Sequence, residues 1–269
     1  YNFKLLTMKK TYYLFLSIFI LSLTFSCDVI EKDNFTDPNA NFPWLGKKVL
    51  IEDFTGYKCT NCPQASSELK TIEELYPEKV VSIAIHAGFF AQPSGNFITD
   101  FRTTGGNELA DFFKPEVFPI GMINRQGYPD NVLLNYTDWA TIAGEKLLQA
   151  PTIDLSISEQ NNSVSIQARR LLESNNSLNL VVCITEDGII DKQIDGSELI
   201  EEYEHNHVLR KVINGTWGSN IQLSSSLSTY SYDYNLEDSW VRSNCNIVAF
   251  VYDNSNKEIL QVEKINLTD

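Results

Sequence analysis

Two cysteines three residues apart, placed between a buried strand and a helix, constrain the fold of this chain more than any other feature. The apolar run 49–51 leads to a glycine turn at Gly56, and Cys59-Thr60-Asn61-Cys62-Pro63 follows at once. Proline suits the first turn of a helix, where no backbone donor is needed. Apolar residues then recur at helical spacing over 64–75. The dithiol is therefore expected at the start of a helix.

The elements after this helix alternate between strand and helix. Residues 80–85 form an apolar run that ends at His86, which predicts a buried strand parallel to the first. A loop-rich insert over 87–116 is expected to hold a short helix at 107–113. The next strand, 117–124, contains Phe118-Pro119, and a short strand at 132–134 and a helix over 138–149 follow.

This order of elements resembles the thioredoxin fold. Asp53 lies six residues before Cys59, where thioredoxins carry a buried acid, and Pro119 stands where they carry a cis-proline facing the dithiol. The resemblance implies a thioredoxin-like α/β domain over 47–150. It also implies that the backbone of Phe118 pairs with an extended protein substrate.

The N-terminus is predicted to be a targeting segment. Lys9 and Lys10 precede an uncharged, mostly apolar run at 12–25, which has the length of a signal peptide rather than of a membrane span. Cys27 follows a small residue and resembles the lipidated cysteine of bacterial lipoproteins. We expect residues 1–26 to be the signal peptide, residues 1–7 to lie upstream of the true start, and residues 27–46 to form the lipidated cysteine and its tether.

Four short stretches, on a lipoprotein precursor, look like the outer-membrane-protein-28-related bacterial lipoproteins. The resemblance is carried by residues 52–56, 59–63, 85–88 and 119–125. It implies an outer membrane lipoprotein of the bacterial cell envelope, facing the periplasm or the cell surface. In that family a thioredoxin-like domain precedes a β-rich domain.

The chemistry expected of the dithiol is thiol–disulfide exchange. A cysteine at a helix N-terminus gains from the helix dipole, so Cys59 is the candidate nucleophile and Lys58 would further favour its thiolate. Cys62, one turn inside the helix, would be the resolving thiol. Asp53 would relay a proton beneath the pair, and His86 would lie nearby.

Each of these assignments has a structural alternative. The two cysteines can alternatively form a structural disulfide in a secreted protein or a motif without activity. Glu52 can be the inward residue in place of Asp53. His86 can be a hydrogen-bonded loop histidine.

Beyond Pro151 the pattern changes to alternating strands. A hairpin over 153–168 and further strands at 178–185, 208–213, 229–236, 244–252 and 258–265 predict an antiparallel β-sandwich domain over 151–269. The stretch 201–207 is a candidate loop presented to a partner.

The remaining cysteines and histidines leave two alternatives each. Cys183 and Cys245 can bond across the sheets or remain buried free thiols. His205 and His207 resemble a metal pair, but no third ligand is evident, so a structural or interface role is favoured. We expect no metal and no cofactor.

The charge balance excludes one class of partner. With 21 Lys and Arg against 35 Asp and Glu, the net charge is −14, and basic residues are not clustered. Nucleic acid is therefore excluded as a partner, since phosphate contacts need a localised positive field. Two functions remain: a lipid-anchored protein-disulfide oxidoreductase acting on protein thiols or a redox partner, and a non-catalytic surface lipoprotein that binds a ligand or acts as an adhesin.

Overall fold

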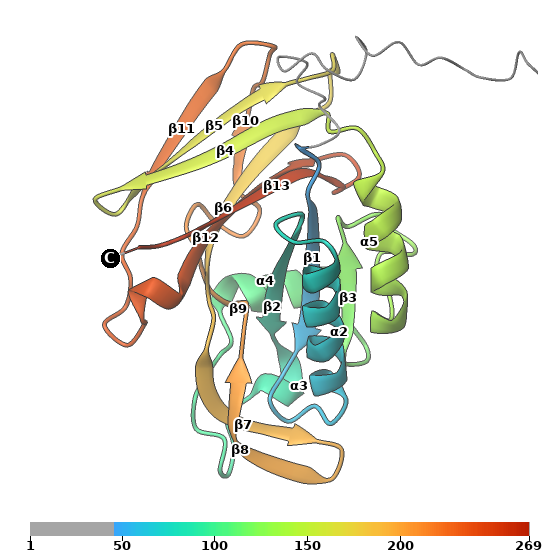
Figure 1. The fold of residues 1–269 in the computed structure, drawn as a ribbon, viewed down its shortest axis with the longest axis vertical. Helices are drawn as coiled ribbons and strands as arrows, with labels where there is room; N and C mark the ends of the chain where they lie inside the picture. Colours follow the sequence, from blue (N-terminus) through green and yellow to red (C-terminus); the bar gives the residue numbers. More distant parts are fainter. Residues whose placement is uncertain (1–45, 269) are drawn as a thin grey trace, which may run out of the picture. The chain divides into compact units, whose positions relative to one another are not determined.

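A computed structural model describes residues 46–268 and shows a chain made mostly of β-strands (Figure 1). Its helices are α2 (Cys62–Leu75), α3 (Gly88–Ala91), α4 (Thr104–Phe113) and α5 (Trp139–Leu147). The strands of the first half are β1 (Val49–Thr55), β2 (Val80–His86) and β3 (Ile120–Ile123). Those of the second half are β4 (Ile153–Gln160), β5 (Ser163–Arg170), β6 (Leu178–Glu186), β7 (Ile189–Asp195), β8 (Glu198–His205), β9 (Val208–Val212), β10 (Ser219–Ile221), β11 (Ser228–Asp233), β12 (Cys245–Asp253) and β13 (Ile259–Asn266).

One large sheet joins strands from both halves of the chain. Its order is β13-β12-β6-β9-β2-β1-β3, and β10 pairs with β6. The predicted parallel pairing of β1 with β2 is confirmed, and β3 lies antiparallel on the other edge of β1. The two halves meet where β2 pairs with β9 at Ala84 and Val208.

The expected fold class, a thioredoxin-like α/β domain followed by a separate all-β sandwich, is therefore wrong. Strands from before and after residue 150 are hydrogen-bonded into the same sheet, and the described chain is mostly β. The expected boundary at residues 150 and 151 falls between α5 and β4, and its status as a domain boundary stays a prediction.

The hydrophobic core explains why the halves are not independent. One cluster joins Phe54 and Ile85 of the first half to Cys183, Leu209 and Phe250 of the second. The other face of β6 and β12 packs against the three-stranded sheet β11-β5-β4. Because apolar burial is the main stabilising term in folding, a core shared in this way ties the two halves together.

Helix α2 forms as its sequence predicts. Its buried residues Cys62, Ala65, Leu69 and Ile72 lie on one side, against β1, β2 and α5. Pro63 occupies the first turn. The opposite, polar side of α2 carries serines and charged residues, and it faces the second half of the chain at the cleft described below.

The hairpin of β7 and β8 was not expected from the sequence, which indicated a loop over part of it. The two strands pair only with each other, and Gly196 turns the chain between them with a positive φ of 57°. In Figure 1 the hairpin lies at the end of the molecule where α2 begins. It therefore reaches the cysteine motif from the opposite half of the chain.

Candidate functional site

Cys59 and Cys62 form a disulfide at the start of α2. Each residue is only 2% exposed. The turn before them depends on Gly56, since a Cβ there would lie 2.6 Å from the backbone carbon of Phe90 in the insert. The close approach of the insert covers one side of the motif.

The β7–β8 hairpin covers the other side. Gln193 donates from Nε2 to the carbonyl oxygen of Cys59 at 3.0 Å. The backbone amides of Ile194 and Gly196 donate to the carbonyl oxygens of Tyr57 and Thr60, both at 2.8 Å. Three hydrogen bonds thus hold the hairpin against the segment that carries the disulfide.

The residues expected to assist the dithiol have other contacts. Lys58 donates to the carbonyl oxygen of Gln92 at 2.6 Å and to Ser94 Oγ at 3.1 Å, and its ammonium lies over the ring of Phe89. The Phe118–Pro119 peptide bond is cis, and the ring of Phe118 packs beside the ring of Phe90.

Glu52 and Asp53 are both buried, so the structure does not choose one of them as the inward residue. Glu52 forms a two-pronged ion pair with Arg125, with distances of 2.7 Å to Nε and 2.6 Å to Nη2. The guanidinium of Arg125 also lies over the rings of Phe250 and Tyr252. This pair belongs to the shared core.

Asp53 lines the other face of the sheet. It is 1% exposed, and its Oδ1 has no hydrogen-bond partner among the described residues. Burial raises the pKa of Asp53 to about 8, and the charge of His207 opposes this only in part. A buried carboxyl without a partner is costly, so its retention points to a role other than stability.

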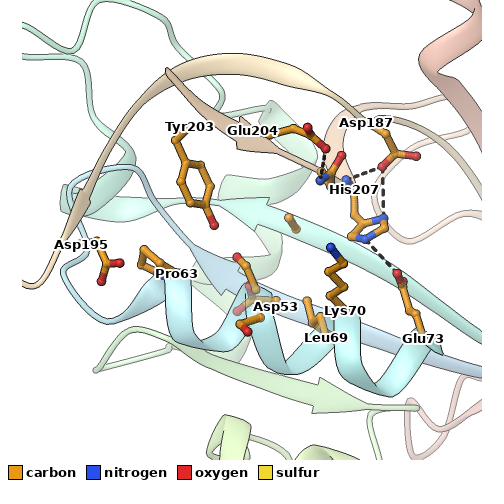
Figure 2. A pocket seen from close by; sticks show the side chains of 14 residues that line it. Asp53, Pro63, Leu69, Lys70, Glu73, Asp187, Asp195, Tyr203, Glu204 and His207 are labelled. Atoms are coloured by element: carbon orange, nitrogen blue, oxygen red, sulfur yellow. Dashed lines mark hydrogen bonds and ion pairs between the residues drawn. The ribbon is translucent and has the colours of Figure 1, made fainter. Parts of the chain in front are cut away.

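Asp53 lies in an open cleft of about 720 Å³, which we call the α2–β8 cleft. One wall is the polar side of α2 and the other is β8 with the residues after it, as Figure 2 shows. The lining residues are Asp53, Pro63, Ser66, Ser67, Leu69, Lys70, Glu73, Ala84, Asp187, Asp195, Tyr203, Glu204, Asn206 and His207.

His207 closes one end of this cleft. Its Nε2 lies 3.3 Å from Glu73 of α2, and its Nδ1 lies 3.2 Å from Asp187 (Figure 2). Burial alone would lower the pKa of His207, but the hydrogen bonds to Asp187 and Glu73 outweigh it and raise the pKa to about 9. The imidazolium therefore bridges two carboxylates and joins the two walls of the cleft.

His86 lies apart from this bridge, in a buried aromatic group. Its ring packs against Phe101 and His205, at centroid distances of 5.0 and 5.7 Å. Burial, with smaller electrostatic contributions from His205 and Arg210, holds the pKa of His86 well below its usual range. His86 is thus a buried neutral ring that packs against neighbouring rings.

Of the two alternatives for Cys183 and Cys245, the structure shows the second, since both are buried free thiols. The reason is strand geometry, since alternate residues of a strand face opposite sides of the sheet. Cys183 belongs to the core shared with β1 and β2, whereas Cys245 belongs to the core beneath the three-stranded sheet.

Comparison with known proteins places this fold in a family. The model of the family described as "Outer membrane protein Omp28" matches residues 107–269. The chain belongs to the Omp28 family. The predicted resemblance to this family and the predicted outer-membrane location are confirmed by the family match. The expected lipidation site, Cys27, and the signal peptide lie outside the described residues.

Three solved structures resemble the Omp28-family chain. HBP35 of Porphyromonas gingivalis matches with a TM-score of 0.66 and 15% identity, over 82% of this chain and 76% of the other. Protein AGR_C_4864 of Agrobacterium tumefaciens has a TM-score of 0.54 and 14% identity, over 82% and 94%. A domain of the outer membrane lipoprotein Omp28 from P. gingivalis has a TM-score of 0.32 and 23% identity, over 45% and 91%. No curated protein matches the chain. The likenesses to HBP35 and AGR_C_4864 show the fold alone.

Two further observations concern metal ligands and membrane-spanning helices. Within residues 46–268, no group of three or more histidine, cysteine or acidic residues is arranged to hold a metal ion. In the same range, no helix is long and apolar enough to cross a membrane.

Sequence reasoning missed most of the cleft. The signal on α2 was available, because Pro63, Ser67, Lys70 and Glu73 recur at helical spacing on the side opposite the apolar one. No sequence pattern in or near α2 indicated that β8 would lie opposite its polar side. Of the residues expected around the dithiol, only Asp53 lines the cleft, which also includes His207 and other residues of the stretch 201–207.

Proposed function

We propose that this Omp28-family lipoprotein is a non-catalytic binding protein and that the α2–β8 cleft is its binding site. The observation that carries the proposal is the carboxyl group of Asp53. It is buried, its Oδ1 has no hydrogen-bond partner among residues 46–268, and it lines an open cleft. Binding sites commonly combine a concave, partly apolar surface with a few polar groups placed to orient the ligand.

The surroundings of the disulfide support this proposal over a catalytic one. A thiol–disulfide exchange site needs its attacking sulfur open to a protein substrate. Here Cys59 and Cys62 are both buried beneath the hairpin and the insert. In the proposed role the disulfide fixes the first turn of α2, which forms one wall of the cleft.

A second candidate is protein-disulfide exchange with protein thiols or a redox partner. It is favoured by the position of Cys62 at the first residue of α2, since a helix N-terminus stabilises a thiolate. This function requires the β7–β8 hairpin to move away from Cys59.

A titration of the full-length protein in detergent, followed by amide NMR, tests the binding function. The probes are n-butylamine, n-butanol and butyrate, which share a four-carbon stem and differ in charge. We expect at least one probe to shift the amide signals of residues that line the cleft. Ser67→Trp, which fills the cleft, should abolish these shifts, whereas Gln64→Trp on the outer side of the same helix should not.

The reduction potential of the disulfide in the same protein distinguishes the binding function from the exchange function. A reduction potential of the Cys59–Cys62 pair below about −300 mV, with slow alkylation after reduction, supports the structural role of the disulfide. No cleft shift with any probe, together with a potential between about −120 and −270 mV, would instead support the exchange function.

A further inference from the structure

We propose that the ligand of the α2–β8 cleft is a small aliphatic amine, bound as its cation, with the Asp53 carboxylate as its counter-ion. This inference rests on the proposed binding function and names the chemical class of the ligand.

The position of Asp53 provides the first argument. Asp53 belongs to β1, and it lies beside α2 near Pro63 and Leu69, with Tyr203 across the cleft (Figure 2). Oδ1 has no donor among residues 46–268, so a donor group of a ligand would be its first hydrogen-bond partner. A charged donor forms the strongest hydrogen bond with a carboxylate.

The charge of the lining provides the second argument. Five carboxyl groups line the cleft, against two basic side chains, Lys70 and His207. The charge of His207 is already matched, because it bridges Glu73 and Asp187. The remaining excess of acidic groups favours a cation over an anion or a neutral ligand.

The apolar lining indicates the rest of the ligand. Pro63, Leu69 and Ala84 give the cleft a hydrocarbon surface beside the carboxyl group. An alkyl stem can be buried against this surface while an ammonium group contacts Asp53. Since no metal-type ligand cluster occurs within residues 46–268, an organic cation fits the described lining better than a metal ion.

Binding of the amine is expected to change the protonation state of Asp53. Burial keeps the empty-cleft Asp53 protonated at neutral pH, because its pKa is about 8. An ammonium ion that binds to the carboxylate therefore releases one proton from Asp53 to solvent, and no covalent bond of the ligand changes. Binding should become stronger as pH rises toward 8.

The groups that face Asp53 do not obscure this dependence. On α2 these are Lys70 and Glu73, on the hairpin Asp195, Tyr203 and Glu204, and beyond it Asp187 and His207. The hydrogen bonds of the bridge hold the pKa of Glu73 and of Asp187 low and that of His207 near 9. Asp53, with a pKa of about 8, is thus the carboxyl group of this set whose pKa is raised toward neutral pH.

Calorimetric titration of the full-length protein with n-butylamine tests the proposal. We expect n-butylamine to bind at least about tenfold more tightly than n-butanol or butyrate at pH 8. Its affinity should rise about tenfold from pH 6 to 7 and about fivefold from pH 7 to 8, with about one proton released at pH 6 and about half a proton at pH 8. Asp53→Asn should weaken amine binding about thirtyfold, whereas Asp130→Asn, on an exposed turn, should leave it unchanged.

Two results would overturn the proposal. One is equal affinity for the three probes, and the other is an amine preference that survives in Asp53→Asn. Butanol or butyrate could bind to the wild type and fail to bind to Ser67→Trp. In that case the cleft would remain a binding site, and only the proposed ligand class would be wrong. If no probe bound at all, the binding function itself would fail.

Discussion

Gln193 and Cys59 are separated by 134 positions in the sequence, and the side chain of the first donates to the backbone carbonyl of the second at 3.0 Å. This hydrogen bond is buried. It ties the tip of the hairpin from the second half of the chain to the disulfide of the first half. The hairpin also forms one wall of the α2–β8 cleft, so the disulfide and the cleft depend on the same contact.

Removing this side chain should loosen the hairpin. Gln193→Ala leaves the buried carbonyl of Cys59 without its side-chain donor, which costs about 1–3 kcal/mol. We expect faster reduction of the disulfide by dithiothreitol and faster hydrogen exchange at the amides of Ile194 and Gly196. Gln64→Ala, on the exposed side of α2, is the matched control. Unchanged reduction and exchange rates in Gln193→Ala would show that the hairpin is held by other contacts.

The disulfide should contribute to stability even though its loop is short. Closing a loop between residues three apart is worth about 2 kcal/mol in the chain-entropy description. The double variant Cys59→Ser/Cys62→Ser should lose about this free energy of unfolding in a urea titration. It should still show the cleft shifts with the NMR probes if the disulfide has only a structural role. Loss of all cleft shifts in a folded double variant would contradict that role.

The local elements of the first half could be read from the sequence, whereas the joining of the halves could not. Helix α2 and the parallel pair of β1 and β2 follow from apolar periodicity and turn residues, which are local signals. The contact of β2 with β9 is a single register pair between Ala84 and Val208. No local pattern encodes such a long-range pairing. Because the sequence does not indicate this pairing, the second half is predicted to be a separate domain.

The hairpin was missed for a different reason. Strand β8 contains four glutamates among its eight residues, and acidic residues are disfavoured in strands. It forms because both strands lie outside the large sheet and pair only with each other, which leaves their charged side chains in contact with water. The opposite faces of Cys183 and Cys245, in contrast, follow from strand alternation once the strand bounds are known.

The buried pair of Glu52 and Arg125 should be sensitive to loss of either partner. Arg125→Met leaves an unpaired buried carboxylate, so we expect a loss of about 3–5 kcal/mol in the free energy of unfolding. The double variant Glu52→Gln/Arg125→Met should recover much of this loss, because no uncompensated charge then remains. Urea unfolding of the wild type, the two single variants and the double variant measures the coupling free energy between the two side chains. Additive effects of the two changes would show that the pair is not coupled.

The bridge of His207 should make stability depend on pH. Its pKa is raised from 6.5 to about 9, so its contribution is complete below pH 6.5 and is lost as pH rises through 9. His207→Asn suits the positive φ of 59° at this position. We expect the wild type to exceed this variant by about 3 kcal/mol at pH 6.5 and by much less at pH 10, measured by urea unfolding. A difference that does not change with pH would mean that the imidazole is neutral.

Asp53 should show the opposite sign, because its charged form is the disfavoured one. Its folded pKa of about 8 lies above the ordinary value of 3.8, so the unfolded chain ionises first as pH rises. The carboxyl group therefore costs progressively more stability between about pH 4 and pH 8. Asp53→Asn should match the wild type near pH 4 and be more stable than the wild type by about 5 kcal/mol at pH 8.

A gain of this kind is the signature of a residue kept for function at the expense of stability. The Asp53→Asn protein should unfold at a higher urea concentration and yet lose its preference for n-butylamine. Asp130→Asn, on an exposed turn, should change neither property. A variant of Asp53 that is less stable than the wild type at pH 8 would show that the carboxyl group has a stabilising partner, and the argument for an amine ligand would lose its first support.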